Sequence, residues 1–205
     1  MNRLDAIIQG SFPTVMVPAY QELEPLKEGM TRLLMAKNGL YLETNPPWGH
    51  LIEQLWESPR ELPYGVVEER DTFKEVIVNT NVLEIIRDKI LPVAVDYALR
   101  KKEWAGWIIR QNGNYSFMPL NIDASGESVR YNTDSLDEGA CVVVDIHSHG
   151  RIEPFFSETD DNDDAGGVKI CMVMGNFREE DSRPVFDPVI IRYAIHGFFI
   201  RRVLL

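Results

Sequence analysis

The sequence is poor in cysteine and has no long apolar run. Its two cysteines, Cys141 and Cys171, lie far apart in apolar stretches, without the density of a disulfide scaffold or the spacing of a structural zinc site. We therefore expect two reduced thiols in the core. No apolar run approaches the roughly 18 residues of a membrane helix, and residues 1–5 lack the pattern of a signal peptide. These absences predict a cytoplasmic, bacterial-type protein without a membrane partner.

Positive charge is also scarce. Lysine and arginine number 21 against 32 aspartate and glutamate residues, which gives a net charge of −11. A surface of this sign repels phosphate backbones and anionic lipids, so nucleic acid is excluded as the main partner. The composition, 44% apolar and 26% charged, is typical of a folded globular chain rather than a disordered one.

Proline and glycine interrupt residues 1–80 repeatedly. Short apolar runs at 33–35 and 39–42 lie between these breaks, a pattern typical of short strands and turns. The run 50–56 has apolar residues at 51, 52, 55 and 56, which is the spacing of one face of a two-turn helix. We expect a β-rich accessory region over 1–80 that contains this helix.

From residue 81 the pattern becomes helical. Apolar residues recur at steps of three and four, at Val82, Ile86, Ile90, Val93 and Tyr97. They form one stripe along a helix. Pro92 leaves two alternatives, because either two helices meet near Leu91 or one helix has Pro92 in its first turn.

Strand-like runs follow this helical segment. They lie at 104–109, 115–120, 128–131, 140–146, 168–174, 189–195 and 198–204. A helix start interrupts them where Asp160 follows Ser157 by three residues, which is the pattern of an N-cap. Helix, strands, helix and strands in this order predict an α/β (α+β) fold over 81–205, with helices against the faces of a sheet.

Two of the four histidines form a spaced pair at the end of an apolar run, His147 and His149. Residues i and i+2 of a strand point to the same side, so the two imidazoles aim at one point. Asp160 follows in the first turn of the expected helix. Two histidines and a carboxylate, with water as the fourth ligand, are typical of a catalytic zinc site. Each residue alone has an ordinary explanation as a packed histidine or a helix cap.

The spacing His147-x-His149-x7-Ser157-x2-Asp160 resembles the signature of the JAMM, or MPN+, zinc metalloproteases, without insertion or deletion. The resemblance implies a central mixed β-sheet flanked by helices and one Zn²⁺ per chain, with water as its fourth ligand. It also implies an upstream glutamate, for which Glu103 fits best and Glu69 and Glu75 are alternatives. Gly150 departs from the family, in which proline often follows the second histidine.

The same resemblance implies zinc-dependent hydrolysis of an amide or isopeptide bond. Glu103 would act as the general base and Ser157 would donate a hydrogen bond to the oxyanion. The implied substrate is a ubiquitin-like or sulfur-carrier protein tail, and a ThiF-like or E1-like protein is a possible partner. The run Phe155 to Asp161 further resembles members from bacterial PRTRC cassettes, which also encode ThiF-related proteins. Two alternatives stay open: a non-catalytic scaffold that binds such a partner, and a hydrolase of small amides or peptides.

Three further features have simpler interpretations. The acidic run 158–164 is a poor match to a calcium loop, because its sixth and twelfth positions are Ala165 and Cys171; a solvated helix start or an acidic rim of the cleft is left open. His50 and His196 lack ligand-type neighbours and are expected to be structural. An aromatic and proline cluster is expected to form a small satellite core rather than a docking surface. It consists of Pro46, Pro47, Trp48, Trp56 and Tyr64.

Overall fold

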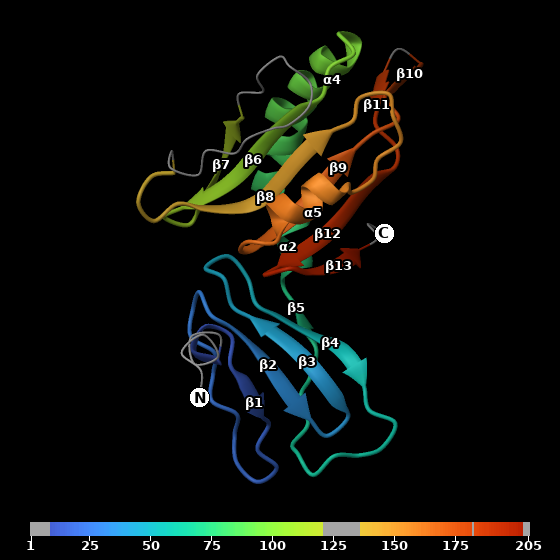
Figure 1. Ribbon diagram of the computed structural model, residues 1–205. Coiled ribbons are helices and arrows are strands. Elements are labelled where there is room, and N and C mark those ends of the chain that lie inside the picture. Colours follow the sequence, from blue (N-terminus) through green and yellow to red (C-terminus); the bar gives the residue numbers. More distant parts are fainter. Residues whose placement is uncertain (1–8, 121–135, 182, 203–205) are drawn as a thin grey trace. The chain divides into compact units, whose positions relative to one another are not determined.

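The computed structural model describes residues 9–120, 136–181 and 183–202. The chain divides into two compact units, Met1–Ile77 and Val78–Leu205 (Figure 1). Each unit contains its own β-sheet. Among the described residues, none of the helices is long and apolar enough to cross a membrane.

The first unit is a five-stranded sheet in the order β1-β2-β3-β4-β5. β1 runs parallel to β2, and the other neighbours are antiparallel. The strands are β1 (Thr14–Met16), β2 (Thr31–Ala36), β3 (Gly39–Thr44), β4 (Leu51–Glu57) and β5 (Arg70–Asp71), followed by helix α2 (Phe73–Ile77). The expectation of a β-rich N-terminal region is therefore confirmed.

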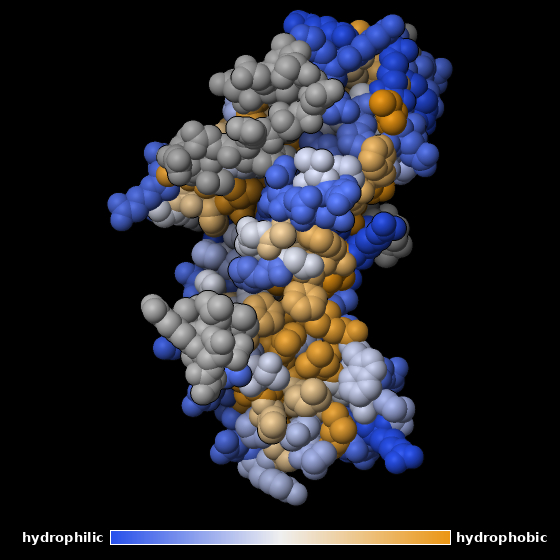
Figure 2. Space-filling model, viewed as in Figure 1, coloured by the Kyte–Doolittle hydropathy of each residue, from blue (hydrophilic) through white to orange (hydrophobic). Residues whose placement is uncertain are grey.

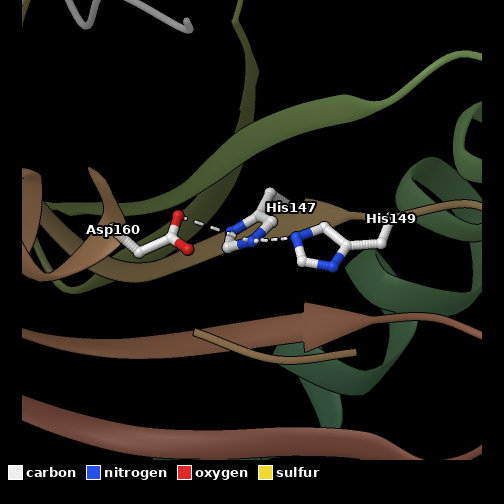
Figure 3. A group of neighbouring side chains, drawn as sticks. All are labelled: His147, His149 and Asp160. Carbon is white, nitrogen blue, oxygen red and sulfur yellow. Dashed lines mark hydrogen bonds and ion pairs between the residues drawn. The ribbon is translucent and has the colours of Figure 1, made fainter. Parts of the chain in front are cut away.

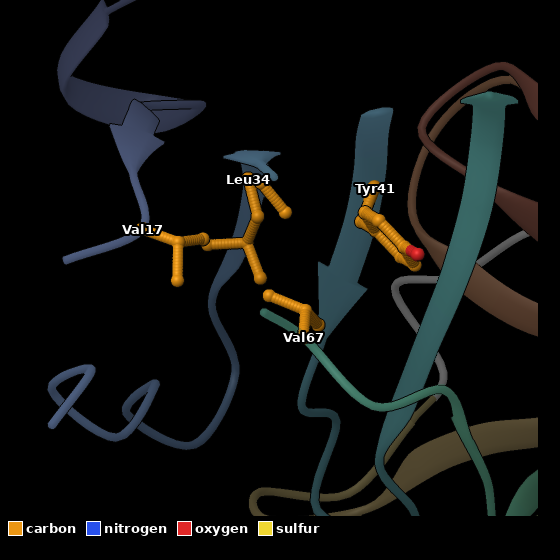
Figure 4. Packing of buried hydrophobic residues seen from close by; sticks show 5 residues of the cluster. Val17, Leu34, Tyr41 and Val67 are labelled. Atoms are coloured by element: carbon orange, nitrogen blue, oxygen red, sulfur yellow. The ribbon is translucent and has the colours of Figure 1, made fainter. Parts of the chain in front are cut away.

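Alternation along β2 and β3 places one row of apolar side chains in a core. Leu34 lies opposite Tyr41 across the two strands, and both pack with Val17 and Val67 (Figure 4). All four side chains are buried. This cluster stabilises the unit by removing apolar surface from water.

A charged pair continues the same row of the sheet. Arg32 lies opposite Glu43, and its Nε donates to Glu43 Oε2 at 2.6 Å. His50 Nε2 lies 2.9 Å from the other oxygen, Glu43 Oε1. Trp48, from the aromatic and proline cluster, packs against Phe73 with ring centroids 4.3 Å apart. His50 and Trp48 thus have structural partners within this unit.

The helix expected at 50–56 is wrong, because these residues form strand β4. Opposite β3, Leu40 faces Trp56 whereas Tyr41 faces Gln54, so Leu55 is an additional residue in β4. Such a bulge interrupts the alternation of a strand. The apolar residues on either side of Leu55 are therefore out of phase, and their spacing imitates that of a helix.

The second unit contains a six-stranded mixed sheet in the order β13-β12-β9-β8-β6-β7. Only β8 and β9 run parallel among these neighbours. The strands are β6 (Trp104–Gln111), β7 (Asn114–Pro119), β8 (Cys141–Ser148), β9 (Val168–Met174), β12 (Val189–Ile195) and β13 (Phe198–Arg202). A hairpin of β10 (Arg178–Glu180) and β11 (Arg183–Val185) was not expected from the sequence.

The helical stripe forms three consecutive segments, α3 (Thr80–Ile85), a π-helical turn η1 (Ile86–Ile90) and α4 (Leu91–Leu99). Pro92 lies in the first turn of α4, as one of the two alternatives expected. A proline has no N–H to donate and displaces the carbonyl one turn earlier, and a π turn accommodates such a change in hydrogen bonding. The segments therefore follow one another without a loop.

The expected strands correspond to β6, β7, β8, β9, β12 and β13, except for 128–131, which lies outside the described residues. The expected helix start is confirmed, since Ser157 caps α5 (Glu158–Asp164). Parallel strands need a crossover connection, and α5 lies in the one between β8 and β9. The two helices α4 and α5 lie on opposite faces of the sheet (Figure 1). This mixed α+β architecture confirms the expected fold class.

Candidate metal centre

The two histidines and Asp160 come together where β8 ends and α5 begins (Figure 3). His147 Nε2 lies 3.2 Å from His149 Nε2 and 3.6 Å from Asp160 Oδ1. All the potential ligand atoms lie within 4.8 Å of one another. The His147 side chain of β8 points toward α5, and the Asp160 side chain of α5 points back toward His147. The carboxyl end of a parallel strand is a common place for a ligand site.

Backbone contacts beyond β8 position His149. Its N–H donates to the Met174 carbonyl of β9 at 2.9 Å, and its Nδ1 lies 3.4 Å from the Glu153 carbonyl oxygen. A carbonyl can only accept, so this contact favours the tautomer with hydrogen on Nδ1 and a lone pair on Nε2. The Nε2 atom is the one that faces His147.

Gly150 explains the departure from the common His-Pro sequence. Its φ is 57°, which proline cannot adopt because its ring fixes φ near about −65°. The Gly150 N–H also donates to Ser148 Oγ at 3.0 Å, and proline has no such donor. The loop after His149 therefore follows a path that requires a residue other than proline.

The helix cap orients Asp160. Ser157 donates from its backbone N and its Oγ to Asp160 Oδ2, each at 2.6 Å, and Ser157 Oγ accepts from the Asp160 N–H at 3.2 Å. These bonds occupy Oδ2 and leave Oδ1 directed at His147. The Ser157 hydroxyl thus points to the carboxylate that completes the cluster.

Burial controls the charge of His147. Desolvation lowers the pKa of this imidazole below its ordinary value, against the opposing effect of the Asp160 carboxylate. Its side chain is 17% exposed. A histidine with a lowered pKa is neutral at neutral pH and keeps the lone pair that a metal needs.

These three residues fit a zinc ion. Tetrahedral bonds of about 2.0–2.1 Å separate neighbouring ligand atoms by about 3.3 Å, close to the 3.2 Å and 3.6 Å observed around His147 Nε2. Three protein ligands leave a fourth position for water or substrate, as in catalytic rather than structural sites. The cluster therefore has the donor set of a catalytic zinc site, and its spacing around His147 is compatible with one.

Glu103 lies directly before β6, which pairs with β8. It is exposed and lines a pocket of about 260 Å³ together with His149. Its negative charge partly opposes the lowering of the His147 pKa that burial causes. The alternatives Glu69 and Glu75 belong to the other unit, Met1–Ile77. Among these three glutamates, Glu103 is the one in the unit that contains the cluster.

Sequence reasoning missed a buried charge network beneath α5. Lys169 of β9 contacts Asp145 at 2.6 Å and Asp164 at 2.7 Å. Arg192 of β12 binds Asp164 at 2.6 Å and also pairs with Asp161. The available signal was a single charged residue inside each of three otherwise apolar strand runs.

The register of the sheet explains why these charges meet. Asp145 lies opposite Cys171, and Cys171 lies opposite Arg192, so the three share one row and one face. The guanidinium of Arg192 also lies between the rings of Phe156 and Phe199, 4.0 and 4.1 Å from their centroids. The network therefore fastens α5, and with it Asp160, to three strands of the sheet.

The cysteines take no part in the cluster. Cys141 is partly buried, Cys171 is buried, and both are free thiols. Burial raises the pKa of Cys171, which disfavours the reactive thiolate.

Residues 91–186 match the family model of prokaryotic homologues of the JAB domain, and residues 2–74 match a domain of unknown function, DUF2016. The first match includes Glu103, His147, His149, Ser157 and Asp160, and it supports a JAB-type assignment of that segment. No curated protein was found to match the sequence. A solution structure of a Desulfitobacterium hafniense protein is 15% identical, covers 58% of this chain and 88% of its own, and has a TM-score of 0.39.

Proposed function

We propose that this protein is a zinc-dependent hydrolase that cleaves an amide or isopeptide bond at His147, His149 and Asp160. The observation that carries the proposal is the convergence of these three side chains, whose ligand atoms all lie within 4.8 Å of one another. Two of their distances, both from His147 Nε2, are close to the ligand spacing of tetrahedral zinc. The JAB-type match over residues 91–186 supports it. The sequence resemblance to JAMM metalloproteases points to the same reaction.

The chemistry divides between the metal and the chain. A zinc ion bound here would lower the pKa of water toward about 7 and polarise the scissile carbonyl. Glu103 accepts the proton of the attacking water and delivers it to the nitrogen as the C–N bond breaks. The acyl carbon gains the hydroxyl and the amine gains the proton, so no covalent enzyme intermediate is required.

Ser157 has two tasks in this proposal. Before substrate binds, its hydroxyl donates to Asp160 Oδ2 at 2.6 Å and holds the carboxylate in place. During the reaction the hydroxyl turns to the carbonyl oxygen of the substrate, where negative charge develops. The backbone N–H of Ser157 continues to bind Asp160 Oδ2, so the ligand keeps its orientation while the hydroxyl moves.

The proposed substrate is the tail of a ubiquitin-like or sulfur-carrier protein, and a ThiF-like or E1-like protein is the proposed partner. Both come from the sequence resemblance. They fit an acidic, bacterial-type protein for which neither nucleic acid nor a membrane is expected as partner.

Zinc content tests the site first. We expect about one zinc per chain by elemental analysis of protein purified without a metal-affinity tag, and a clear loss in His147→Ala and His149→Ala. Full zinc occupancy in His147→Ala would contradict the ligand assignment. Absence of zinc in the wild type, even after incubation with the metal, would favour the non-catalytic scaffold.

Cleavage of ubiquitin-like and sulfur-carrier fusions, followed by intact mass, tests the reaction. Glu103→Gln is expected to keep zinc and to lose turnover, because the amide cannot accept the proton. Glu84→Gln, an exposed carboxylate on α3, is the matched control and is expected to behave like wild type. Near wild-type turnover in Glu103→Gln would assign the general base to another residue.

A further inference from the structure

The pocket beside the cluster of His147, His149 and Asp160 is lined mainly by cationic residues among its charged side chains. It measures about 260 Å³ and is lined by Lys101, Lys102, Glu103, His149, Gly150, Arg151 and Ile152. Three of these residues are cations, in a chain whose net charge is −11. None of the three has an ion-pair partner among the described residues. Arg151 rests on the ring of Phe177, 5.9 Å from its centroid.

The opposite end of the cluster is acidic. His147 lies between Asp160 and His149 in Figure 3, and the ligand atoms of the three form a triangle, all within 4.8 Å of one another. The pocket borders His149, whereas α5 begins at the Asp160 end with the exposed Glu158. A substrate that extends from the pocket past the cluster to α5 meets three cations and Glu103 on one side, and carboxylates on the other. The site therefore distinguishes the two sides of the scissile bond by charge.

The position of Glu103 sets the direction in which the substrate passes the cluster. This step rests on the proposed function, in which Glu103 delivers a proton to the leaving amine. Proton delivery requires hydrogen-bond reach, so the leaving amine must lie on the side of Glu103, which lines the pocket. The acyl part then lies toward Ser157 and α5.

We propose that this pocket binds a carboxylate of the leaving group. Lys102 and Arg151 would supply charge-assisted hydrogen bonds to it, and the negative Glu103 would lie nearer the amine. The cavity is smaller than the pockets that hold drug-sized ligands and suits a group of about one amino-acid residue. The carboxylate has two sources, the free C-terminus of a single amino acid or the side chain of an acidic residue after the scissile bond.

Binding to the Glu103→Gln variant of the full chain tests the pocket without turnover. The probes are Gly-Ala, which has a free C-terminus, its amide Gly-Ala-NH₂, and Asp-NH₂, which carries only a side-chain carboxylate. Nuclear magnetic resonance shifts of the backbone amides of residues 150–152 report occupancy. We expect the better carboxylate probe to bind about tenfold more tightly than Gly-Ala-NH₂. Tighter binding of Gly-Ala would identify the carboxylate as a free C-terminus, and tighter binding of Asp-NH₂ would identify it as an acidic side chain.

Charge removal locates the contact. Lys102→Gln and Arg151→Gln, each in the Glu103→Gln background, are expected to reduce the preference for carboxylate to nearly equal affinities. Lys89→Gln, at an exposed cation of η1 outside the pocket, is the matched control and keeps the preference. Equal affinity of acid and amide probes, or no saturable binding of either carboxylate probe at millimolar concentration, would overturn the proposal.

The same probes on zinc-free protein separate this proposal from metal binding. A pocket that recognises carboxylate keeps its preference after chelation of zinc. A preference that disappears with zinc and survives Lys102→Gln and Arg151→Gln would place the carboxylate on the metal and refute the pocket. Because turnover is not measured, an inactive enzyme would contradict the proposed function and leave the outcome of this test intact.

Discussion

Removal of Arg192 is the most direct test of how the cluster is held together. Its guanidinium pairs with Asp161 and Asp164 of α5 and lies between two aromatic rings. The side chain is 4% exposed, so Arg192→Ala leaves a hole and removes one of the two cations that pair with Asp164. Because α5 carries Asp160, the substitution is expected to weaken both the fold of this unit and its affinity for zinc.

The structure indicates that the stability lost in Arg192→Ala lies near the lower end of the range measured for broken buried ion pairs. Breaking a buried ion pair typically costs about 3–5 kcal/mol. Asp164 keeps Lys169 at 2.7 Å as a second cation, and Asp161 is 48% exposed and regains water. We therefore expect a loss of about 3 kcal/mol in the free energy of unfolding. Zinc affinity should fall about 10-fold to 100-fold, as for loss of a group that orients a ligand.

Amide hydrogen exchange of β8, β9 and β12 measures the stability of this unit separately from the first, and competition with a chelator measures zinc affinity. Arg178→Ala is the matched control, because Arg178 also pairs with two carboxylates, Glu180 and Asp187, but is 41% exposed. Little change is expected there, since surface pairs are screened by solvent. Equal effects of the two substitutions, or unchanged zinc affinity in Arg192→Ala, would refute the proposed role of the network.

Three further predictions test other parts of the chain. Ser157→Ala should lower zinc affinity and turnover together, because Asp160 Oδ2 loses one of its two donors from Ser157; zinc titration and fusion cleavage check this. Gly150→Pro should reduce zinc affinity about tenfold or more, whereas Gly150→Asn, which tolerates positive φ, should keep most of it. Leu42→Ala, at a fully buried position, should cost about 2–5 kcal/mol in urea unfolding of the first unit without change in zinc content.

Much of the fold could be predicted because periodicity is a local property. The apolar runs of the second unit alternate or continue as strands require, and β6, β7, β8, β9, β12 and β13 lie where these runs do. The helix expected at 50–56 is wrong because of how β4 pairs with its neighbour. A bulge at Leu55 shifts the phase of β4 against β3, and the sequence of β4 alone does not show that its partner lacks the matching residue.

In the candidate site, too, the features set by neighbours in sequence could be predicted, and those set by strand order could not. The side-by-side placement of His147 and His149 and the cap at Ser157 depend on neighbours in sequence, and the structure brings both to one point. The charge network depends on register instead. Asp145 and Arg192 share a row only because β9 lies between their strands, and a single sequence does not reveal that order. The roles of Glu103 and Ser157 in catalysis stay predictions.

The acidic character of α5 shows why the candidate site depends on the sheet beneath it. This seven-residue helix carries five carboxylates, and a helix of that length is not stable alone in water. Asp160 near its first turn suits the positive end of the helix dipole, but Asp163 and Asp164 lie near the negative end. Lys169 and Arg192 offset that repulsion from the strands below. Asp160, the third residue of the candidate cluster, is therefore in place only when β9 and β12 have formed, so zinc binding is expected to be coupled to the folding of this unit.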